Sequence, residues 1–188
     1  MQVRGLHQDL SLLWALFDRI ASKRVGVLNR SGIVHTISHS RKDDLYDRSR
    51  FRDRMIINPK GEPPTEDVER FKRLAGQGAI LVSPSVGTGY DFNDDTCRWQ
   101  FVVKVPFEPP SKILKARQEE DKEYVYYRAM QYLVQAFGRD VRSKTDWSER
   151  FIGDEQMSWF KPNYSHLAPK SFHALYRRAE VLPQPLML

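Results

Sequence analysis

Apolar side chains recur at helical spacing near the start of the chain, and similar patterns return later. Within residues 7–23 the apolar positions fall three or four apart, which places them on one face of a helix. They are Leu10, Leu13, Trp14, Phe17 and Ile20. The charged segment 39–51 also has a helical pattern, and residues 65–76 combine a threonine cap, early acids, late basic residues and a glycine stop. We predict a helix in each segment.

Short apolar runs alternate with these helices and predict strands. The four runs are GIVHTIS at 32–38, RMIIN at 54–58, AILVSPS at 79–85 and WQFVVKVPF at 99–107. The last two are continuous, as in strands that are buried on both faces. Strands that alternate with helices at this spacing predict an α/β domain with a mostly parallel sheet flanked by helices.

A proline break at 109–110 precedes a long segment, up to residue 143, that we predict to be helical. On a helical wheel one face of its last part is apolar: Met130, Leu133, Val134, Phe137 and Val141. The roughly opposite face carries Gln135, Gly138, Arg139 and Arg142.

Two arginines beside a glycine suit an anion with several oxygens. Guanidinium groups bind phosphate through planar, bidentate hydrogen bonds, and glycine lets a ligand approach the backbone closely. The alternative is a solvated surface on which the arginines form ion pairs with Asp140 or Glu149.

Composition narrows the class of protein. The 188 residues, 40% hydrophobic, suffice for one domain over 1–188, with a core at about 10–160 and a C-terminal helical tail. The net charge of +6 suits a polyanionic partner. The single Cys97 excludes an intramolecular disulfide and fits a reducing, cytoplasmic setting. No apolar run approaches the ~20 residues of a membrane span, so we expect no membrane partner.

Four stretches, in this order, carry a resemblance to a known family: GIVHTIS, ILVSPSVGTGYDF at 80–92, FVVKVPF at 101–107 and QAFGRDVRS at 135–143. Together they resemble the second motor domain of superfamily-two helicases of the XPD/DinG-like group. In that family the first is motif four, the second motif five and the last motif six, whose glutamine, glycine and arginines are the most specific part. The resemblance covers roughly residues 10–160 and implies a RecA-like three-layer domain.

The resemblance also implies roles for individual residues. Arg139 and Arg142 are similar to the arginines that reach the γ-phosphate of ATP across an interdomain cleft, as arginine fingers do. Residues implied to lie at the nucleotide are Gln135, Gly138, Gly89 and Asp91. Residues implied to grip the phosphates of single-stranded DNA, or of RNA, are Thr36, Ser38, Ser83, Ser85 and Thr88.

The chain departs from the family pattern in two ways. Gly87 and Thr88 stand where the family usually has Ser or Thr followed by Glu, and no phosphate loop of the form G-x-x-x-x-G-K-[ST] occurs in the 188 residues. We therefore expect a first RecA-like domain, in cis or in trans, to hold most of the ATP and Mg²⁺. We expect this chain alone to hydrolyse no ATP and to bind no cofactor tightly.

A second function remains open on the same fold. The chain would then be a non-catalytic module that holds nucleic acid or another protein without turnover.

Other polar and aromatic residues carry weaker signals. His35 and His39 straddle a predicted strand end, so we favour a structural role over metal binding. The arginines at 48, 50, 52 and 54 alternate along the chain, and we favour a solvated charged surface over a phosphate track. Trp99 and Phe101 are expected in the core rather than stacked on bases.

Overall fold

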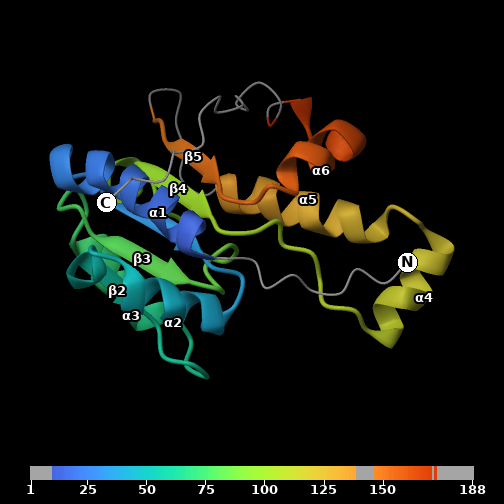
Figure 1. Ribbon diagram of the computed structural model, residues 1–188, viewed down its shortest axis with the longest axis horizontal. Coiled ribbons are helices and arrows are strands. Elements are labelled where there is room, and N and C mark those ends of the chain that lie inside the picture. Colours follow the sequence, from blue (N-terminus) through green and yellow to red (C-terminus); the bar gives the residue numbers. More distant parts are fainter. Residues whose placement is uncertain (1–9, 139–145, 171, 173–188) are drawn as a thin grey trace.

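A five-stranded parallel sheet forms the centre of the protein (Figure 1). The computed structural model describes residues 10–138, 146–170 and 172. The strand order is β2-β3-β1-β4-β5, and every neighbouring pair is parallel. The strands are β1 Gly32–His35, β2 Met55–Ile57, β3 Ile80–Ser83, β4 Trp99–Val102 and β5 Glu149–Ile152. The predicted α/β class with a parallel sheet is confirmed.

The helices alternate with the strands, as predicted. They are α1 Leu10–Ala21, α2 His39–Arg48, α3 Thr65–Arg73, α4 Lys112–Glu120, α5 Tyr124–Phe137 and α6 Met157–Tyr164. A π-helical segment, Ser22–Val27, continues α1, and short 3₁₀ turns lie at Arg52–Arg54, Asp94–Thr96 and Ser165–Leu167. Among the described residues, none of these helices has the length and apolar character needed to cross a membrane.

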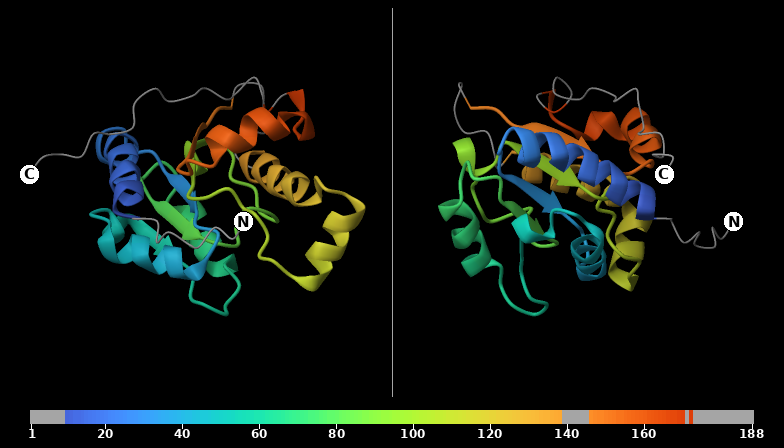
Figure 2. Two further views of the ribbon diagram at one scale, coloured as in Figure 1. Left: turned by 45° about the vertical axis from the view of Figure 1, so that its right-hand side comes forward. Right: turned by 60° about the vertical axis from the view of Figure 1, so that its left-hand side comes forward.

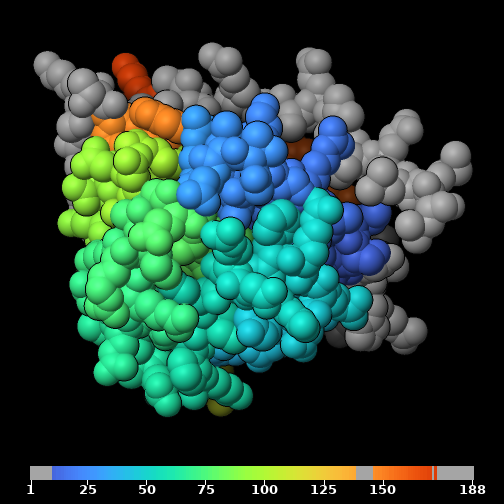
Figure 3. All heavy atoms as spheres, turned by 90° about the vertical axis from the view of Figure 1, so that its left-hand side faces the viewer, coloured from blue at the N-terminus to red at the C-terminus, as the bar shows by residue number. Residues whose placement is uncertain are grey.

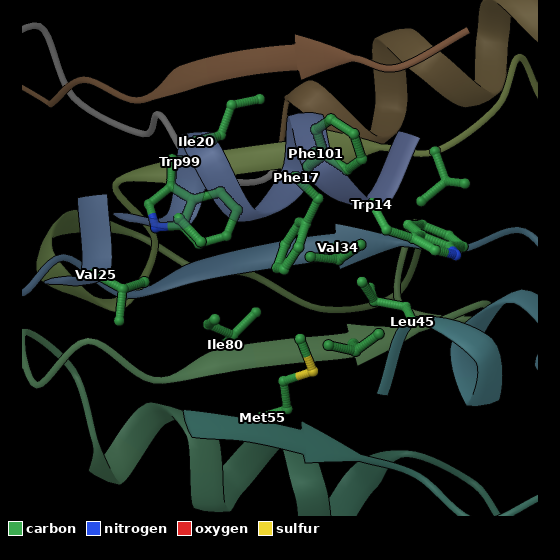
Figure 4. Packing of buried hydrophobic residues seen from close by; sticks show 13 residues of the cluster. Trp14, Phe17, Ile20, Val25, Val34, Leu45, Met55, Ile80, Trp99 and Phe101 are labelled. Atoms are coloured by element: carbon green, nitrogen blue, oxygen red, sulfur yellow. The ribbon is translucent and has the colours of Figure 1, made fainter. Parts of the chain in front are cut away.

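Helices cover both faces of the sheet, which gives three layers (Figure 2). On one face α1 contributes Trp14, Phe17 and Ile20 to a cluster with Trp99 and Phe101 of β4 (Figure 4). Leu45 of α2 joins the same cluster in the structure. The expected core positions of Trp99 and Phe101 are confirmed, since both side chains are fully buried.

The other face is covered by α3 and α5. Phe71 of α3 packs with Ile33 and Leu81, while Leu133 of α5 packs in a separate cluster with Val102. Strand alternation explains this division, because successive side chains of β1 and β4 point to opposite faces. The strands are therefore buried on both faces, as their continuous apolar runs predict.

Two expectations about the helices need correction, and two elements were not predicted. The single long helix after residue 110 is two helices, because Asp121 is extended (φ −137°, ψ 106°) and its carboxylate accepts the amide of Glu123 at 2.9 Å. Thr65 does not cap α3; the cap position is Pro64, without a side-chain cap bond. Strand β5 was not predicted because its positions are all half-buried and include Glu149 and Arg150. Helix α6 was not predicted either, and it has Pro162 inside it.

Charged residues hold the edge strand β5 at the amino ends of the strands. Glu149 accepts hydrogen bonds from Arg24 and, at 3.4 Å, from Arg30. Arg98 donates to Asp146 at 2.8 Å, and its guanidinium lies 4.9 Å from the centre of the Trp147 ring. Figure 3, which looks onto this end, shows the blue, yellow-green and orange segments meeting along one edge.

Gly32 sets how closely β1 approaches β4, which predicts a sharp effect of substitution. Gly32 stands opposite Trp99 in the parallel register, and a Cβ atom at this position would overlap the atoms of the indole ring. We expect Gly32→Ala to destabilise the fold by about 1–3 kcal/mol or more, because the core offers no space for the ring to move. Urea unfolding would measure the change.

Gly26→Ala is the matched control. The nearest atom to a Cβ at Gly26 is a ring carbon of Phe51 at 4.0 Å, an ordinary contact. We expect its free energy of unfolding to stay unchanged or rise by about 0.4–1 kcal/mol. Equal stability of the two variants would contradict the steric role of Gly32.

Candidate functional site

The carboxyl ends of β1 and β3 bring three predicted site residues together. The amide of Thr36, just after β1, donates to the carbonyl of Ser83 at 3.2 Å. The hydroxyls of Ser83 and Ser85 lie 3.2 Å apart, and the amide of Ser85 donates to the Ser83 hydroxyl at 3.2 Å. Parallel strands end at the same edge of a sheet, so residues nearly fifty positions apart meet there.

These hydroxyl residues differ in how accessible they are. Thr36 and Ser83 are fully buried, and within the described residues the Thr36 hydroxyl has no hydrogen-bond partner. Ser85 and Thr88 are exposed, and Ser38 is half-buried. Direct contact with a ligand is therefore open to Ser38, Ser85 and Thr88, but not to the buried side chains of Thr36 and Ser83.

Ser38 occupies the N-cap position of α2. Its hydroxyl oxygen accepts the amide of Arg41 at 3.3 Å, which leaves the hydroxyl proton available to another acceptor. The first amides of α2 face the same edge, and such amides favour anions because they lack partners within the helix.

A strained residue lies between Thr36 and Ser38. Ile37 has φ 65°, in the left-handed region that β-branched side chains rarely adopt. Its side chain packs against the cluster that includes Val102 and Leu133. Such a backbone conformation costs about 1–3 kcal/mol and persists only where the surrounding packing imposes it. This left-handed conformation turns the backbone sharply from β1 into α2 and places Ser38 at the edge of the sheet.

The loop after β3 carries the residues that match motif five. Gly89 has φ +87° and open space around its Cα, so a side chain there would be strained although no atom blocks it. Asp91 is exposed, and Tyr90 and Phe92 anchor the loop against the α3 side of the core. The predicted roles of Gly89 and Asp91 stay predictions.

Helix α5 ends at the predicted motif six. Gln135 and Gly138 are both exposed, in agreement with the polar face that the helical wheel predicts. Gly138 is the C-cap of α5 with φ −88°, so its backbone conformation does not require glycine. Arg139 and Arg142, together with Asp140 and Val141, lie outside the described residues. On the opposite face Met130, Leu133 and Phe137 are buried, as predicted.

A buried series of hydrogen bonds lies behind this edge and was not predicted from the sequence. Nε2 of His35 lies 2.7 Å from Oε1 of Gln100, and Nε2 of Gln100 donates to the carbonyl of Ala136 at 3.2 Å. All three residues are at most 1% exposed. The signal in the sequence is a histidine and a glutamine inside otherwise apolar strands, but only the sheet register brings them together.

Tyr132 of α5 lies against the backbone of Gly87, where a Cβ atom would overlap its ring. The ring also meets His35 edge-on, with centroids 6.5 Å apart. Within the described residues the buried Tyr132 hydroxyl has no hydrogen-bond partner, and burial raises its pKa to about 12. Gly87, where the chain departs from the family pattern, therefore makes room for this tyrosine.

The weaker signals have structural explanations. Among the described residues, no group of three or more histidine, cysteine or acidic side chains is placed to hold a metal ion. Arg48 pairs with Asp44 at 2.6 Å and Arg50 with Asp18 at 4.0 Å, while Arg52–Arg54 is a 3₁₀ turn rather than an extended track.

The sequence matches known helicase domains. A family model described as the helicase C-terminal domain matches residues 20–174. The general transcription and DNA repair factor IIH helicase subunit XPD/RAD3 of Saccharomyces cerevisiae is 27% identical over 118 residues. The XPD subunit of the same factor in Dictyostelium discoideum is 27% identical over 103 residues. These alignments cover 55% and 47% of this chain but 15% and 13% of the relatives.

Solved helicase structures share the fold. An XPD helicase structure aligns over 89% of this chain and 33% of its own, with a TM-score of 0.61 and 16% identity. An apo XPD structure aligns over 87% and 36%, with a TM-score of 0.63 and 18% identity. Domain 2 of the DEAD-box helicase Mss116p, bound to an RNA duplex, aligns over 91% and 61%, with a TM-score of 0.56 and 12% identity. The RecA-like architecture is thereby confirmed.

The raised pKa of Tyr132 predicts a loss of stability at high pH. Between pH 10 and 12 the unfolded chain loses the phenol proton while the folded chain keeps it, so stability falls as pH rises through this window. The loss is up to about 1.4 kcal/mol per pH unit. We expect Tyr132→Phe to remove this component, as measured by the difference in unfolding free energy between parent and variant across pH 9–12.

Tyr127→Phe, which alters an exposed tyrosine of the same helix, serves as the control and should follow the parent. Parallel curves for the parent and Tyr132→Phe would show that the Tyr132 phenol ionises as readily when folded as when unfolded.

Proposed function

Since this chain belongs to the helicase C-terminal domain family, we propose that it acts as the second motor domain of an ATP-dependent DNA helicase. The domain is of the XPD-like kind. The observation that carries the proposal is that the loops matching motifs four and five meet at one edge of the sheet, while the end of α5, where motif six begins, is bonded to the strands behind that edge. Thr36 and Ser83 are joined there by a backbone hydrogen bond, and Gln100 ties the end of α5 to the same strands.

The end of α5 is the proposed nucleotide side. Arg139 and Arg142 would stabilise the charge on the transferring phosphoryl group when a first RecA-like domain closes against this one. Gln135, Gly138 and Gly89 fit such a site because all three are exposed, and Gly89 has open space around it. Asp91 would link this side to the nucleic-acid track. The first domain would hold most of the ATP and the Mg²⁺, which neutralises phosphate charge.

The loops after β1 and β3 are the proposed nucleic-acid side. The hydroxyls of Ser38, Ser85 and Thr88 are accessible, and the buried Thr36 and Ser83 hold the backbone on which these loops depend. Hydroxyls and backbone amides bind phosphates independently of base sequence. The relatives named as subunits of a DNA repair factor favour single-stranded DNA as the ligand, with RNA as the alternative.

A non-catalytic module on the same fold is the second candidate. Gly87 and Thr88, which depart from the family pattern in motif five, favour it. ATP turnover by a motor that contains this chain separates the two functions, because a binding module would not depend on Arg142.

Arg142→Ala tests the proposed function in a motor in which this chain works with a first RecA-like domain. We expect kcat for ATP to fall about 10³-fold or more, because an arginine finger acts on transition-state charge. Affinity for single-stranded DNA and the melting temperature should change little, because the proposed role of Arg142 is at the nucleotide. Steady-state ATP turnover, DNA titration and thermal unfolding measure the three effects.

Arg142→Lys is the matched control for charge alone. We expect it to leave kcat low, because an ammonium group cannot reproduce the planar, forked contact of guanidinium with phosphate. Full turnover by Arg142→Ala would refute the finger role, and early melting would assign Arg142 to a structural ion pair.

Single-strand binding tests the proposed track. We expect the chain to bind single-stranded DNA weakly, without sequence preference and less well as salt rises, because phosphate contacts release counterions. Replacing Ser85 and Thr88 together by alanine should lower the affinity several-fold, whereas Ser158→Ala on α6 should not. Fluorescence anisotropy at several salt concentrations would measure this, and tight, sequence-specific binding would refute the assignment.

A further inference from the structure

One buried chain of hydrogen bonds connects three elements of the domain. It runs from His35 at the end of β1, through Gln100 of β4, to the carbonyl of Ala136 in the last turn of α5. Its two hydrogen bonds join residues 65 and 36 positions apart. Side chains this deeply buried cannot exchange their partners for water, so the geometry of the chain is fixed by the protein alone.

The chemistry of these groups fixes which atom donates and which accepts in each of the two hydrogen bonds. A carbonyl oxygen can only accept, so Gln100 must present its amide NH₂ to Ala136 and its oxygen to His35. His35 must then carry its ring proton on Nε2 and donate it to Gln100. Gln100 therefore cannot flip its amide without losing both bonds, and His35 cannot turn its ring without losing the bond to Gln100.

The carbonyl at the end of this chain belongs to a helix terminus. The last four carbonyls of an α-helix lack an amide partner within the helix, and α5 ends at Phe137. The Gly138 amide is directed at the carbonyls of Gln135, at 3.2 Å, and Ala136, and within the described residues Gln100 is the side chain that donates to the Ala136 carbonyl. A side chain from the central sheet thus fixes the height and rotation of the last turn of α5.

This turn adjoins the proposed catalytic arginines. Gln135 comes directly before Ala136 in the sequence, and Gly138 and Arg139 come two and three positions after it. At the other end of the chain, His35 precedes Thr36, and the carbonyl of His35 accepts the amide of Val103 at 3.1 Å. The strand ends of the nucleic-acid side and the helix end of the nucleotide side are therefore tied to one buried glutamine.

Stability alone does not account for these residue types. Well-packed apolar residues of similar volume are often as stabilising as a buried polar network, and the neighbouring positions Val34, Phe101 and Val102 are all apolar and fully buried. What an apolar pair cannot do is hold a carbonyl at a fixed position. The specific consequence of His35 and Gln100 is the placement of the Ala136 carbonyl.

We propose that Gln100 is a positioning residue for the ATP-hydrolysis step, with His35 orienting its amide. Through the Ala136 carbonyl it holds the end of α5 where the motif-six arginines can reach the nucleotide. The inference rests on the proposed function and adds residues outside the motif-six segment to it.

The test is the double variant His35→Leu with Gln100→Leu, in a motor in which this chain works with a first RecA-like domain. Removing both side chains leaves only the Ala136 carbonyl without its side-chain donor, so we expect the variant to fold with a melting temperature several degrees below that of the parent. We expect kcat for ATP to fall about 10- to 100-fold with KM nearly unchanged, because a displacement of about 1 Å can cost that much. DNA affinity should change less than two-fold.

Gln77→Leu is the matched control. The amide of Gln77 also bonds a helix-end carbonyl, that of Arg73 in α3, at 3.4 Å, but on the exposed surface and away from the site. It should keep the parental kcat, which shows that loss of a glutamine-to-helix bond as such is harmless. Gln100→Met, which keeps the length of the side chain, provides a second test if the double variant melts early, and we expect the same loss of kcat.

The outcomes separate this inference from the proposed function. If Arg142→Ala abolishes turnover while the folded double variant, or folded Gln100→Met, keeps the parental kcat, the positioning role is wrong and the proposed function stands. A rise in KM without a change in kcat would also overturn the positioning role. If Arg142→Ala itself keeps full turnover, the proposed function fails and the positioning role falls with it.

Discussion

The parallel pairing of β1 with both β3 and β4 is the constraint on which the rest of the structure depends. Register pairs Gly32 with Ile80 on one side and with Trp99 on the other, so all three strands begin and end together. Because their carboxyl ends share one edge, the loops that follow them must meet. The close approach at Gly32, beneath the Trp99 indole, keeps the central strands in this alignment.

The two faces of the sheet differ in the interactions that their side chains make. Side chains of β1 and β4 alternate, so Val34 and Phe101 pack in the apolar cluster under α1, while His35 and Gln100 face α5. On the first face the strand side chains contribute burial, and indoles supply side-chain hydrogen bonds, as from Trp14 to Asp44 at 2.6 Å. The second face adds hydrogen bonds between strand side chains, which are directional, and it is the face on which the helix with the motif-six segment lies.

The features that depend on local periodicity could be predicted from the sequence. Continuous apolar runs predicted β3 and β4, a short apolar run predicted β1, and the helical wheel predicted the buried face of α5 from Met130 and Leu133. Prediction failed where the signal is weak or non-local. Strand β5 is half-buried and partly charged, and its place depends on contacts of Glu149 with Arg24, over a hundred residues away.

The candidate site, too, was predicted only in the parts that have a local signal in the sequence. Motif order located the loops and the end of α5, but no periodicity links His35 with Gln100, since their contact exists only through the register of β1 and β4. Nor did the sequence distinguish the buried hydroxyls of Thr36 and Ser83 from the exposed one of Ser85. Burial at a strand end depends on what packs over it, which the periodicity of a single strand does not reveal.

The two edges of the sheet contrast in a way that bears on function. At the amino edge, charges such as Glu149 are paired and aromatic rings are covered by guanidinium groups, as stability alone requires. At the carboxyl edge, Ile37 is strained, and within the described residues the buried hydroxyls of Thr36 and Tyr132 lack partners. Departures from local rules concentrate where a protein uses its structure for something besides folding. The amino edge also has residues in the left-handed region, but these are Asn29 and Asp94, types that tolerate it, whereas Ile37 is β-branched and does not. The strain at Ile37, between Thr36 and Ser38, is therefore the departure that supports a function for the carboxyl edge.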